Sequence, residues 1–412
     1  MTSEIDLVAP PVRIELPGEF WDSQVYAGGL LLFTREGSIR TLDWRQLVAE
    51  LPIAEELRIV ADAALLSNHR LYGAGARELI SDPEVRSLLM SKFVRLSQAV
   101  VLWDAASRAR VSEFENPVPH PHNDSEIHYD QLFLGGTSGL YQIATDPARR
   151  GKRTRQKRSD VAVLDLAAAH KTLAVAAGAD GLFEAVITDT PHRDLAPLTT
   201  VLEETCSSCD WSFESLIASG PKNRLTFAEY DRVPASEPRA GRRIPYVRKF
   251  EQLLTESDLF GSEAGESAIC WGAHERVYRA LGSRVETVRY QPGRATENTP
   301  AFLSPEAHQI DMADSGLPPL SARTAAFGSV LELDDALHVI PTLGTSFTIP
   351  GEPVSWRVFP RSRDYLNHLH IVYEDRLVIY AFTHDYFADQ DRKWSGFEVG
   401  RSETAVRTRR KE

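Results

Sequence analysis

The chain has 412 residues and a formal net charge of −12 at pH 7, with 42% hydrophobic and 25% charged residues. The core of a single compact domain stops growing at about 250–300 residues, so this length predicts either several domains or a repeat architecture. The acidic balance argues against a dedicated nucleic-acid binder, because phosphate backbones are bound by basic surfaces.

The beginning of the chain shows no signal for export or membrane insertion. MTSEIDLVAPPVRIELPGEF (1–20) lacks a basic start followed by an apolar run. No stretch approaches the roughly 18–20 consecutive apolar residues that cross a bilayer. Three cysteines are too few for a disulfide framework, which favours a reducing compartment. Because Arg outnumbers Lys and Ala is abundant, we expect a cytoplasmic protein of bacterial origin.

A recurring pattern of two alternating apolar runs around a turn first occurs in LLLFTREGSIRTLDW (30–44). The same shape returns at 133–144, 174–187, 224–233, 268–281, 327–342 and 369–384. Glycine supplies the positive φ that tight turns require, and β-branched and aromatic residues suit a half-buried sheet. Each segment therefore predicts a β-hairpin, with turn centres near residues 36, 137, 180, 230, 274, 333 and 375.

The spacing of these hairpins predicts the fold. From residue 137 onward, successive turn centres are between about 42 and 59 residues apart. Repeats of about 40–50 residues that contain several strands are typical of β-propellers, because one four-stranded sheet must pack against neighbours until the ring closes. We expect an all-β fold, a single closed propeller over residues 1–400 with about seven four-stranded blades. Eight blades, or a β-sandwich or α/β domain with chance hairpins, are the alternatives.

The first gap between hairpins is about twice the period, which predicts a blade with a helical insert near 74–98. In DPEVRSLLMSKFVRL (82–96), Asp82 suits a helix N-cap and Pro83 suits the first turn. Residues 53–73 and 100–114 are expected to contribute strands. Longer loops are expected at 146–159, 234–249 and 290–325, with a polar tail at 401–412.

Both ends of the chain carry a short predicted strand. These are VRIELP (12–17) and WSGFEVGR (394–401). A propeller closes by pairing a strand from one terminus with the blade formed by the other, which removes an open edge. We expect the ring to close in this way.

This pattern resembles β-propellers in general, including the WD-repeat proteins. WD-repeat proteins carry a Trp-Asp pair at the end of a strand in most blades. Here Trp103-Asp104 matches, whereas Leu42-Asp43-Trp44 and Cys209-Asp210-Trp211 do not. No Gly-His pair recurs ahead of the blades. The resemblance implies the propeller fold without a specific family, and it transfers no site residue.

The densest polar cluster lies in PVPHPHNDSEIHYDQ (117–131). Within it, His120, His122 and His128 are candidate metal ligands, with Asp124 and Asp130 beside them. The competing interpretation is an inter-blade loop, in which Pro, His, Asn and Asp are ordinary turn residues. We predict no cofactor.

Other motifs argue against metal binding, phosphate binding and nucleophilic catalysis. Cys206 and Cys209 have C-x-x-C spacing, but a zinc site needs a second ligand pair and Cys270 stands alone. CDWSFESLIA (209–218) is expected to form a strand with buried, unreactive thiols. The sequence contains no Walker-type phosphate loop and no G-x-S-x-G elbow.

Two basic segments, ARRGKRTRQKR (148–158) and PRAGRRIPYVRK (238–249), are candidate partner-binding sites. Their candidate contact residues are Arg149, Arg150, Lys152, Arg153, Arg155, Lys157, Arg158, Arg242, Arg243 and Tyr246. Such loops suit an acidic protein surface first and nucleic-acid phosphates second. Solvated loops without a partner are the remaining interpretation.

We therefore expect a non-catalytic cytoplasmic scaffold, adaptor or sensor subunit that binds a partner protein within a bacterial multi-protein assembly and does not bind membranes. The first alternative is a propeller enzyme, a hydrolase or lyase with its site in the central channel. Converging carboxylates or histidines in that channel would favour the enzyme. The second alternative, a nucleic-acid sensor, needs both basic segments on one face.

Overall fold

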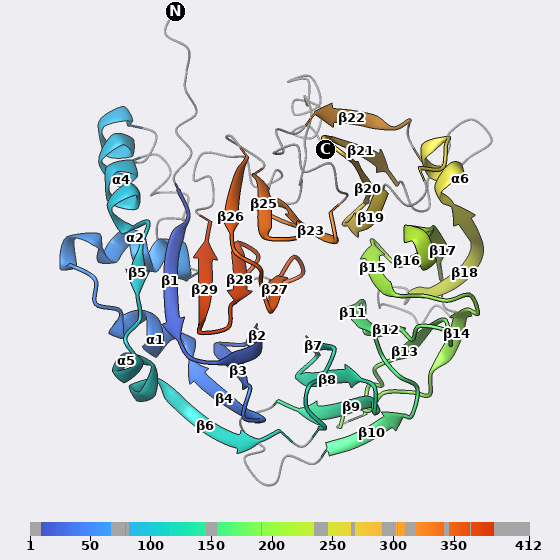
Figure 1. Ribbon diagram of the computed structural model, residues 1–412, viewed down its shortest axis with the longest axis horizontal. Helices are drawn as coiled ribbons and strands as arrows, with labels where there is room; N and C mark the ends of the chain where they lie inside the picture. The colour runs from blue at the N-terminus through green and yellow to red at the C-terminus, as the bar shows by residue number, and fades with distance from the viewer. Residues whose placement is uncertain are drawn as a thin grey trace, which may run out of the picture.

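Seven sheets, here called blades, surround a central channel, and their strands pair antiparallel apart from one short parallel pair at the edge of the last blade (Figure 1). The seven-bladed propeller expected from the hairpin spacing is confirmed. The computed structural model describes residues 10–66, 79, 82–116, 118–145, 155–190, 192–234, 246–264, 268–290, 302, 304–309, 319–341, 346–362 and 364–382.

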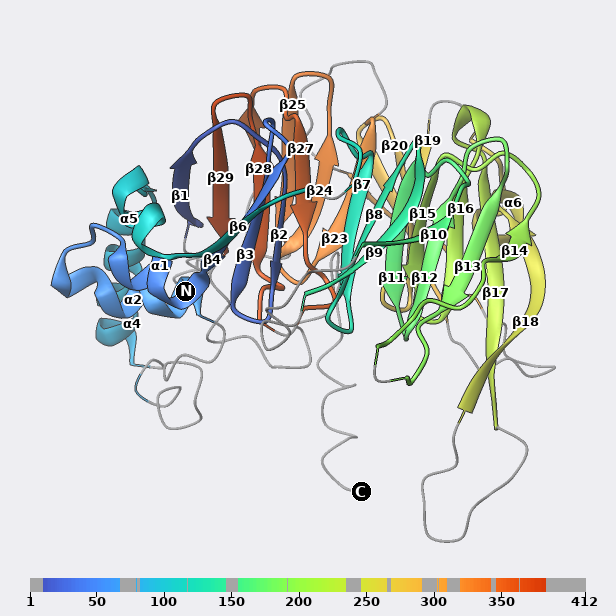
Figure 2. The ribbon, with the colours of Figure 1, turned by 90° about the horizontal axis from the view of Figure 1, so that it is seen from below.

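In blades 1 to 6 the first strand along the chain lines the channel and later strands lie progressively further out, whereas in blade 7 β27 lines the channel and the N-terminal strand β1 lies outside β29 (Figures 1 and 2). Blade 1 comprises β2 (Phe20–Tyr26), β3 (Gly29–Thr34), β4 (Ser38–Asp43) and β6 (Arg110–Glu115); blade 2 comprises β7 (Asp124–His128), β8 (Gln131–Gly136), β9 (Gly139–Ala144) and β10 (Arg155–Ser159). Blade 3 comprises β11 (Asp165–Ala169), β12 (Thr172–Ala176), β13 (Leu182–Val186) and β14 (Thr199–Leu202); blade 4 comprises β15 (Ser208–Ser212), β16 (Ser215–Ser219), β17 (Leu225–Pro234) and β18 (Tyr246–Thr255). Blade 5 comprises β19 (Ala268–Ala273), β20 (Arg276–Leu281), β21 (Arg284–Arg289) and β22 (Glu306–Gln309); blade 6 comprises β23 (Ser321–Ala325), β24 (Gly328–Glu332), β25 (Ala336–Pro341) and β26 (Phe347–Pro350). Blade 7 comprises β27 (Ser355–Val358), β28 (His368–Val372), β29 (Arg376–Ala381), β1 (Val12–Pro17) and β5 (Ala99–Val100).

The N-terminal strand closes the ring. β1 pairs antiparallel with β29, from Val12 opposite Ala381 to Pro17 opposite Arg376. Its apolar side chains alternate inward, and Ile14 is 1% exposed. The expected closure by residues 12–17 is confirmed, whereas the predicted strand at 394–401 lies outside the described residues.

Two predictions in blade 4, one of a hairpin and one of a strand, are wrong. Residues 224–233 were expected to turn near 230, but β17 runs through that point as one strand with a bulge beside Tyr230. Conversely, residues 209–218 form the hairpin β15–β16 rather than one strand, because Phe213 adopts a φ of 53° at the turn. A 3-10 turn, η3 (Pro221–Asn223), then joins β16 to β17, and α6 (Glu256–Phe260) follows β18.

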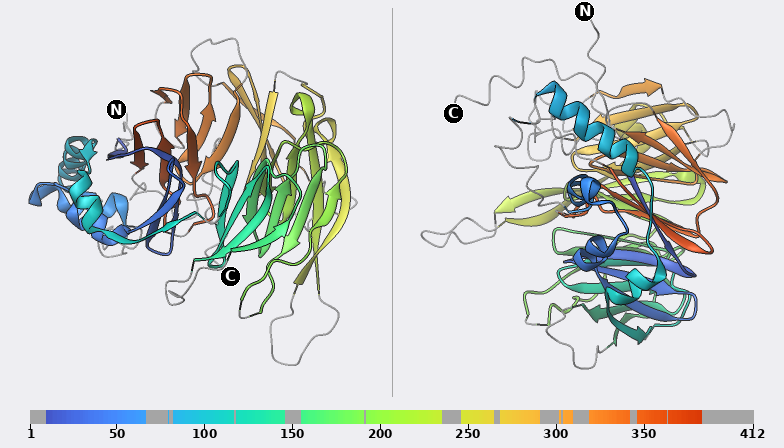
Figure 3. Two further views of the ribbon diagram at one scale, coloured as in Figure 1. Left: turned by 60° about the horizontal axis from the view of Figure 1, so that its bottom comes forward. Right: turned by 90° about the vertical axis from the view of Figure 1, so that its left-hand side faces the viewer.

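The insert between β4 and β6 contains more helix than expected. It comprises α1 (Trp44–Glu50), α2 (Glu55–Leu65), α4 (Pro83–Leu96), the short strand β5 and α5 (Trp103–Arg108). The helix expected at 82–96 forms as α4, and Asp82 accepts hydrogen bonds from Glu84 N and Val85 N. These helices pack beside blades 1 and 7 (Figures 1 and 3). No helix in the described part of the chain is long and apolar enough to cross a bilayer.

The strands expected within 53–73 and 100–114 are partly wrong. α2 forms instead because Leu57, Val60 and Ala64 recur at helical spacing and are buried together. Trp103-Asp104, the single match to the WD-repeat pattern, begins α5 rather than ending a strand.

Strands also occupy parts of the three segments expected as loops. β10 lies within 146–159, β18 begins within 234–249, and β22 and β23 lie within 290–325. Outer strands such as β10, RQKRS, are solvated on much of their surface and therefore lack the apolar alternation that predicts a strand. The remaining residues 146–154 and 235–245 lie outside the described part, as does the tail 401–412.

Neighbouring blades share apolar cores and are tied by tryptophan side chains. Trp211 of blade 4 is fully buried and donates from Nε1 to the carbonyl oxygen of Ala167 in blade 3 at 3.0 Å. Trp271 of blade 5 likewise donates to Thr324 Oγ1 of blade 6 at 2.8 Å. Each indole thus fills the gap between blades and also satisfies its own N–H group.

Glycine is required where a turn approaches the next strand. Gly181 has a φ of 97°, and a Cβ atom there would lie 2.1 Å from the carbonyl oxygen of Leu202. Gly37 has a similar φ of 86°, but a Cβ atom would meet nothing within 4 Å. A comparison of the two positions therefore separates the cost of backbone strain from the cost of a steric clash.

Gly181→Ala should lower the free energy of unfolding by about 3 kcal/mol, because left-handed strain and a backbone clash add. Gly37→Ala should cost about 1 kcal/mol, because strain acts alone. Urea denaturation of both variants checks this difference, and equal losses would contradict the close approach to Leu202.

Candidate functional site

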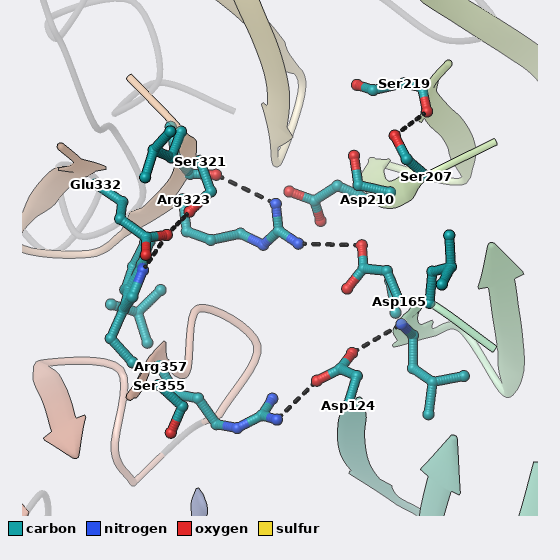
Figure 4. Close-up of a pocket in the computed structure, with 18 of the residues that line it drawn as sticks. Asp124, Asp165, Ser207, Asp210, Ser219, Ser321, Arg323, Glu332, Ser355 and Arg357 are labelled. Atoms are coloured by element: carbon teal, nitrogen blue, oxygen red, sulfur yellow. Dashed lines mark hydrogen bonds and ion pairs between the residues drawn. The ribbon is translucent and has the colours of Figure 1, made fainter. Parts of the chain in front are cut away.

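A polar cavity of about 530 Å³ occupies one end of the central channel (Figure 4). Residues that directly precede the inner strands line it, including Asn123, Leu164 and Leu320. The cavity therefore lies at the face of the ring where the inner strands begin, and we call it the cup. Arg361, from the connection after β27, also lines it.

Aspartate residues recur near the beginning of four consecutive inner strands. They are Asp22 of β2, Asp124 of β7, Asp165 of β11 and Asp210 of β15. Asp124 Oδ2 accepts a hydrogen bond from Leu166 N of the next blade at 2.7 Å. Asp165 Oδ2 accepts one from Cys209 N of the next blade, also at 2.7 Å. Asp124 and Asp165 therefore join blade 2 to blade 3 and blade 3 to blade 4.

Arg357 of blade 7 joins three blades. Its Nε and Nη2 atoms donate to both carboxylate oxygens of Asp22 in blade 1, at 2.6 and 2.8 Å. Nη2 also donates to Asp124 Oδ1 in blade 2 at 2.6 Å. Ser125 Oγ and His122 Nε2 complete the surroundings of Asp22, at 2.6 and 3.2 Å from Oδ2. The result is a buried polar network at the closure of the ring.

Two further arginines cross the channel. Arg323 of blade 6 donates to Asp165 of blade 3 at 3.3 Å, as Figure 4 shows. Arg361 donates to Asp210 of blade 4 at 3.3 Å. Because Arg361 follows the end of β27, it crosses the channel on the side of the cup away from the beginnings of the inner strands.

Burial raises the pKa of three carboxyl groups in this region, and pairing with cations lowers it, so their pKa values differ widely. Burial raises the pKa of Asp22, but the charge of Arg357 and the hydrogen bonds from His122 and Arg357 outweigh it and hold the pKa well below its usual range. Burial, reinforced by Asp124, raises the pKa of Glu126 to about 7. Burial and Asp124 also raise the pKa of Asp165 to about 8, against the opposing charge of Arg323.

The three candidate metal-ligating histidines do not gather. His122 is 1% exposed and contacts Asp22, whereas His120 is exposed on the surface, with ring centroids 6.5 Å apart. His128 lies at the far end of β7, where burial and then Arg361 lower its pKa to about 4. Within the described ranges, no group of three or more His, Cys, Asp or Glu side chains is arranged to hold a metal ion.

The cysteines of the C-x-x-C segment belong to the core. Cys206 and Cys209 pack in the cluster shared by blades 3 and 4. Burial, followed by the nearby Asp165, raises the pKa of Cys206 to about 12. Such thiols stay protonated and are poor nucleophiles at neutral pH.

Of the candidate partner-binding residues whose side chains the structure describes, two lie on the surface and one points into the ring. Arg155 and Lys157 are exposed on β10 and lie over the Tyr141 ring, 5.3 and 5.8 Å from its centroid. Arg158 turns inward and donates to Gln142 Oε1 at 2.7 Å. Tyr246 begins β18, but its side chain lies outside the described part. The remaining candidates, Arg149, Arg150, Lys152, Arg153, Arg242 and Arg243, also lie outside it.

Sequence reasoning missed the inner aspartates and arginines as a group. A signal existed, because Asp124, Asp165 and Asp210 each stand near the beginning of a strand and about one repeat apart. The arginines gave no such signal, since Arg323 and Arg357 lie on strands of other blades and meet the carboxylates across the channel.

Comparisons with known proteins identify the fold of this chain. No family model matches the sequence, and no curated protein matches it. The chain is similar to the β-propeller domain of Cps50 (Swd1) from Myceliophteria thermophila, with a TM-score of 0.50 and 10% identity, covering 91% of this chain and 99% of that one. It is also similar to the WD40 domain of Neurospora crassa Pan2, with a TM-score of 0.39 and 11% identity over 92% of each chain. The first likeness shows a shared propeller fold without a specific family.

Arg357→Met should lower the free energy of unfolding by about 3–5 kcal/mol, because it leaves Asp22 and Asp124 buried without their cation. Arg361→Met should cost less than about 1 kcal/mol, because this side chain is 34% exposed and makes one long ion pair. Urea denaturation compares the two. A small loss for both variants would contradict the bridging role of Arg357.

The raised pKa of Asp165 predicts a pH dependence of stability. The folded protein keeps a proton that the unfolded chain releases above its ordinary pKa near 4, so stability falls as pH rises from about 5 to 8. Asp165→Asn should reduce this loss, by the order of 2 kcal/mol, because the amide cannot ionise. Urea denaturation at pH 5 and pH 8 measures it. An unchanged slope in the variant would assign the pH dependence to other groups.

Proposed function

We propose that the protein is a non-catalytic scaffold, adaptor or sensor subunit that binds a partner protein. The observation that carries this proposal is the hairpin β17–β18. Its two strands of ten residues each are the longest in the described part of the chain. Figure 2 shows that the hairpin extends beyond the disc formed by the other blades.

The outer strand of this hairpin presents apolar side chains to solvent. Val247, Phe250 and Leu253 are 50%, 45% and 44% exposed. No other described strand pairs with the outer edge of β18. Exposed apolar groups on a protruding element suit a protein partner, because burial against that partner removes them from water.

Basic residues accompany these apolar side chains. Connections between third and fourth strands leave the ring at the face where the inner strands end, so the chain enters and leaves both basic segments there, at blades 2 and 4. The proposed contact residues are Arg149, Arg150, Lys152, Arg153, Arg155, Lys157, Arg242, Arg243 and Tyr246. They favour an acidic surface on the partner. The proposal places this partner and the propeller in one assembly in the bacterial cytoplasm.

The alternatives have weaker support. Carboxylates do converge in the channel, as the enzyme alternative requires. However, Asp124 and Asp165 accept backbone N–H groups of the next blade, and Asp22, Asp124 and Asp165 pair with arginines of other blades. The shared exit face of the basic segments suits nucleic acid as well. A net charge of −12 and the apolar strand β18 favour a protein.

The test is affinity purification from the native host, with and without nuclease, followed by native mass spectrometry. We expect a stoichiometric protein partner that survives nuclease and is lost in Phe250→Glu. Leu88→Glu, which changes a 58% exposed side chain on the helical insert, is the matched control and should retain the partner. For the isolated complex, binding should weaken when salt rises from low to physiological concentration.

Three results would overturn the proposal: a bare monomer, a nuclease-sensitive complex, or equal partner recovery with both variants. A bare monomer would return attention to the channel as an active site. A nuclease-sensitive complex would favour the nucleic-acid sensor.

A further inference from the structure

The cup holds more carboxyl groups than cations. Five carboxyl side chains line it from four different strands, whereas arginine supplies the facing positive charges. The carboxyl residues are Asp124, Glu126, Asp165, Asp210 and Glu332, and the arginines are Arg323, Arg357 and Arg361. Arg357 also pairs with Asp22, which adds a sixth carboxyl group. Three guanidinium groups therefore face six carboxyl groups.

The arginines are each directed to a particular aspartate. Arg357 pairs with Asp124, Arg323 with Asp165 and Arg361 with Asp210. Glu332 instead receives neutral donors, Ser321 Oγ at 2.5 Å and Trp356 Nε1 at 2.9 Å, both at Oε2. None of these ion pairs and hydrogen bonds involves Glu126.

Glu126 is the carboxyl group that the surrounding residues leave unpaired. It lies on β7, lines the cup, and makes no hydrogen bond or ion pair with any side chain in the described part of the structure. The charged groups that act on it are Asp124 of the same strand and, from across the channel, Arg357, Arg361 and Arg323. Its raised pKa shows that these arginines do not compensate for burial and Asp124.

We propose that the cup binds an organic cation, a primary ammonium or guanidinium group carried on a narrow chain, with Glu126 as the pairing carboxylate. The volume of about 530 Å³ is within the range of small-molecule sites and admits such a chain. An anionic ligand is disfavoured, because it would add to the excess of carboxylates. A metal ion is disfavoured as well, because the described side chains form no suitable ligand group.

This site is independent of the proposed partner surface. The cup opens where the inner strands begin, and the hairpin β17–β18 extends from the opposite face. Arg361 crosses the channel between the two. The cation has two sources with the same chemistry: a free amine of the cell, or an arginine or lysine side chain of a peptide.

The test is isothermal titration calorimetry of the full chain in low salt at pH 8, with agmatine in one arm and a blocked tripeptide with central arginine in the other. We expect binding with a Kd of the order of 1 mM or tighter in at least one arm. Glu126→Gln should weaken it about tenfold or more. Glu275→Gln, a half-exposed carboxylate on the opposite face, is the matched control and should bind as the unmodified protein does.

The pH dependence gives a second readout. Because Glu126 must lose its proton to pair with the cation, affinity should fall about tenfold between pH 8 and pH 6. Most of this fall should be lost in Glu126→Gln, and what is left belongs to Asp165, which lines the same cup and has its pKa raised to about 8. Binding of agmatine alone identifies a free amine, and binding of the peptide alone identifies a side chain; both support the site. Absence of binding in both arms up to about 10 mM, or equal binding by folded Glu126→Gln, would overturn it.

Discussion

The ring depends on one buried charge network, in which Arg357 of the last blade binds Asp22 of the first and Asp124 of the second. The C-terminal strands β27, β28 and β29 of the last blade must be held to the first blade without a covalent link, because the chain joins the two blades only through β1. Here β1 supplies the backbone pairing at the rim, and Arg357 supplies a bidentate ion pair at the channel. Because the ions are removed from water, breaking one partner costs far more than an exposed pair would.

A similar arrangement holds the next two blade junctions, between blades 2 and 3 and between blades 3 and 4, with backbone N–H groups as donors. Asp124 and Asp165 each accept an N–H group from the following inner strand. A channel lined with carboxylates therefore does not by itself indicate catalysis. These side chains position blades, and the chemistry available to a ligand is reduced to the groups that the blades do not use, of which Glu126 is the clearest.

The fold was accessible from the sequence because propeller repeats carry local signals. Glycine-containing turns and alternating apolar runs predicted the hairpins around residues 137 and 180, and the repeat length predicted the ring. Blade 4 shows where local signals fail: Tyr230 interrupts the alternation at a bulge, and Phe213 turns the chain without glycine. Helix α2 was missed although Leu57, Val60 and Ala64 recur at helical spacing, because the repeat length led us to expect strands in that segment.

The candidate sites were harder to predict from the sequence than the fold, because their residues meet only in the folded ring. Arg323 meets Asp165 across 158 residues, and Arg357 meets Asp22 across 335. No local pattern encodes such pairs, because the closure of the ring creates them. The His122 position illustrates the converse: a histidine conspicuous in the sequence is a buried partner of Asp22.

The central claim is that channel carboxylates join the blades, and amide hydrogen exchange of Leu166 and Cys209 tests it most directly. Both N–H groups face the polar channel, yet each donates to an aspartate of the preceding blade at 2.7 Å. The account predicts that they exchange among the slowest amides of the protein, at the rate of global unfolding. Exchange as fast as that of the exposed turn amides would contradict it, because the aspartates would then not hold the blades together.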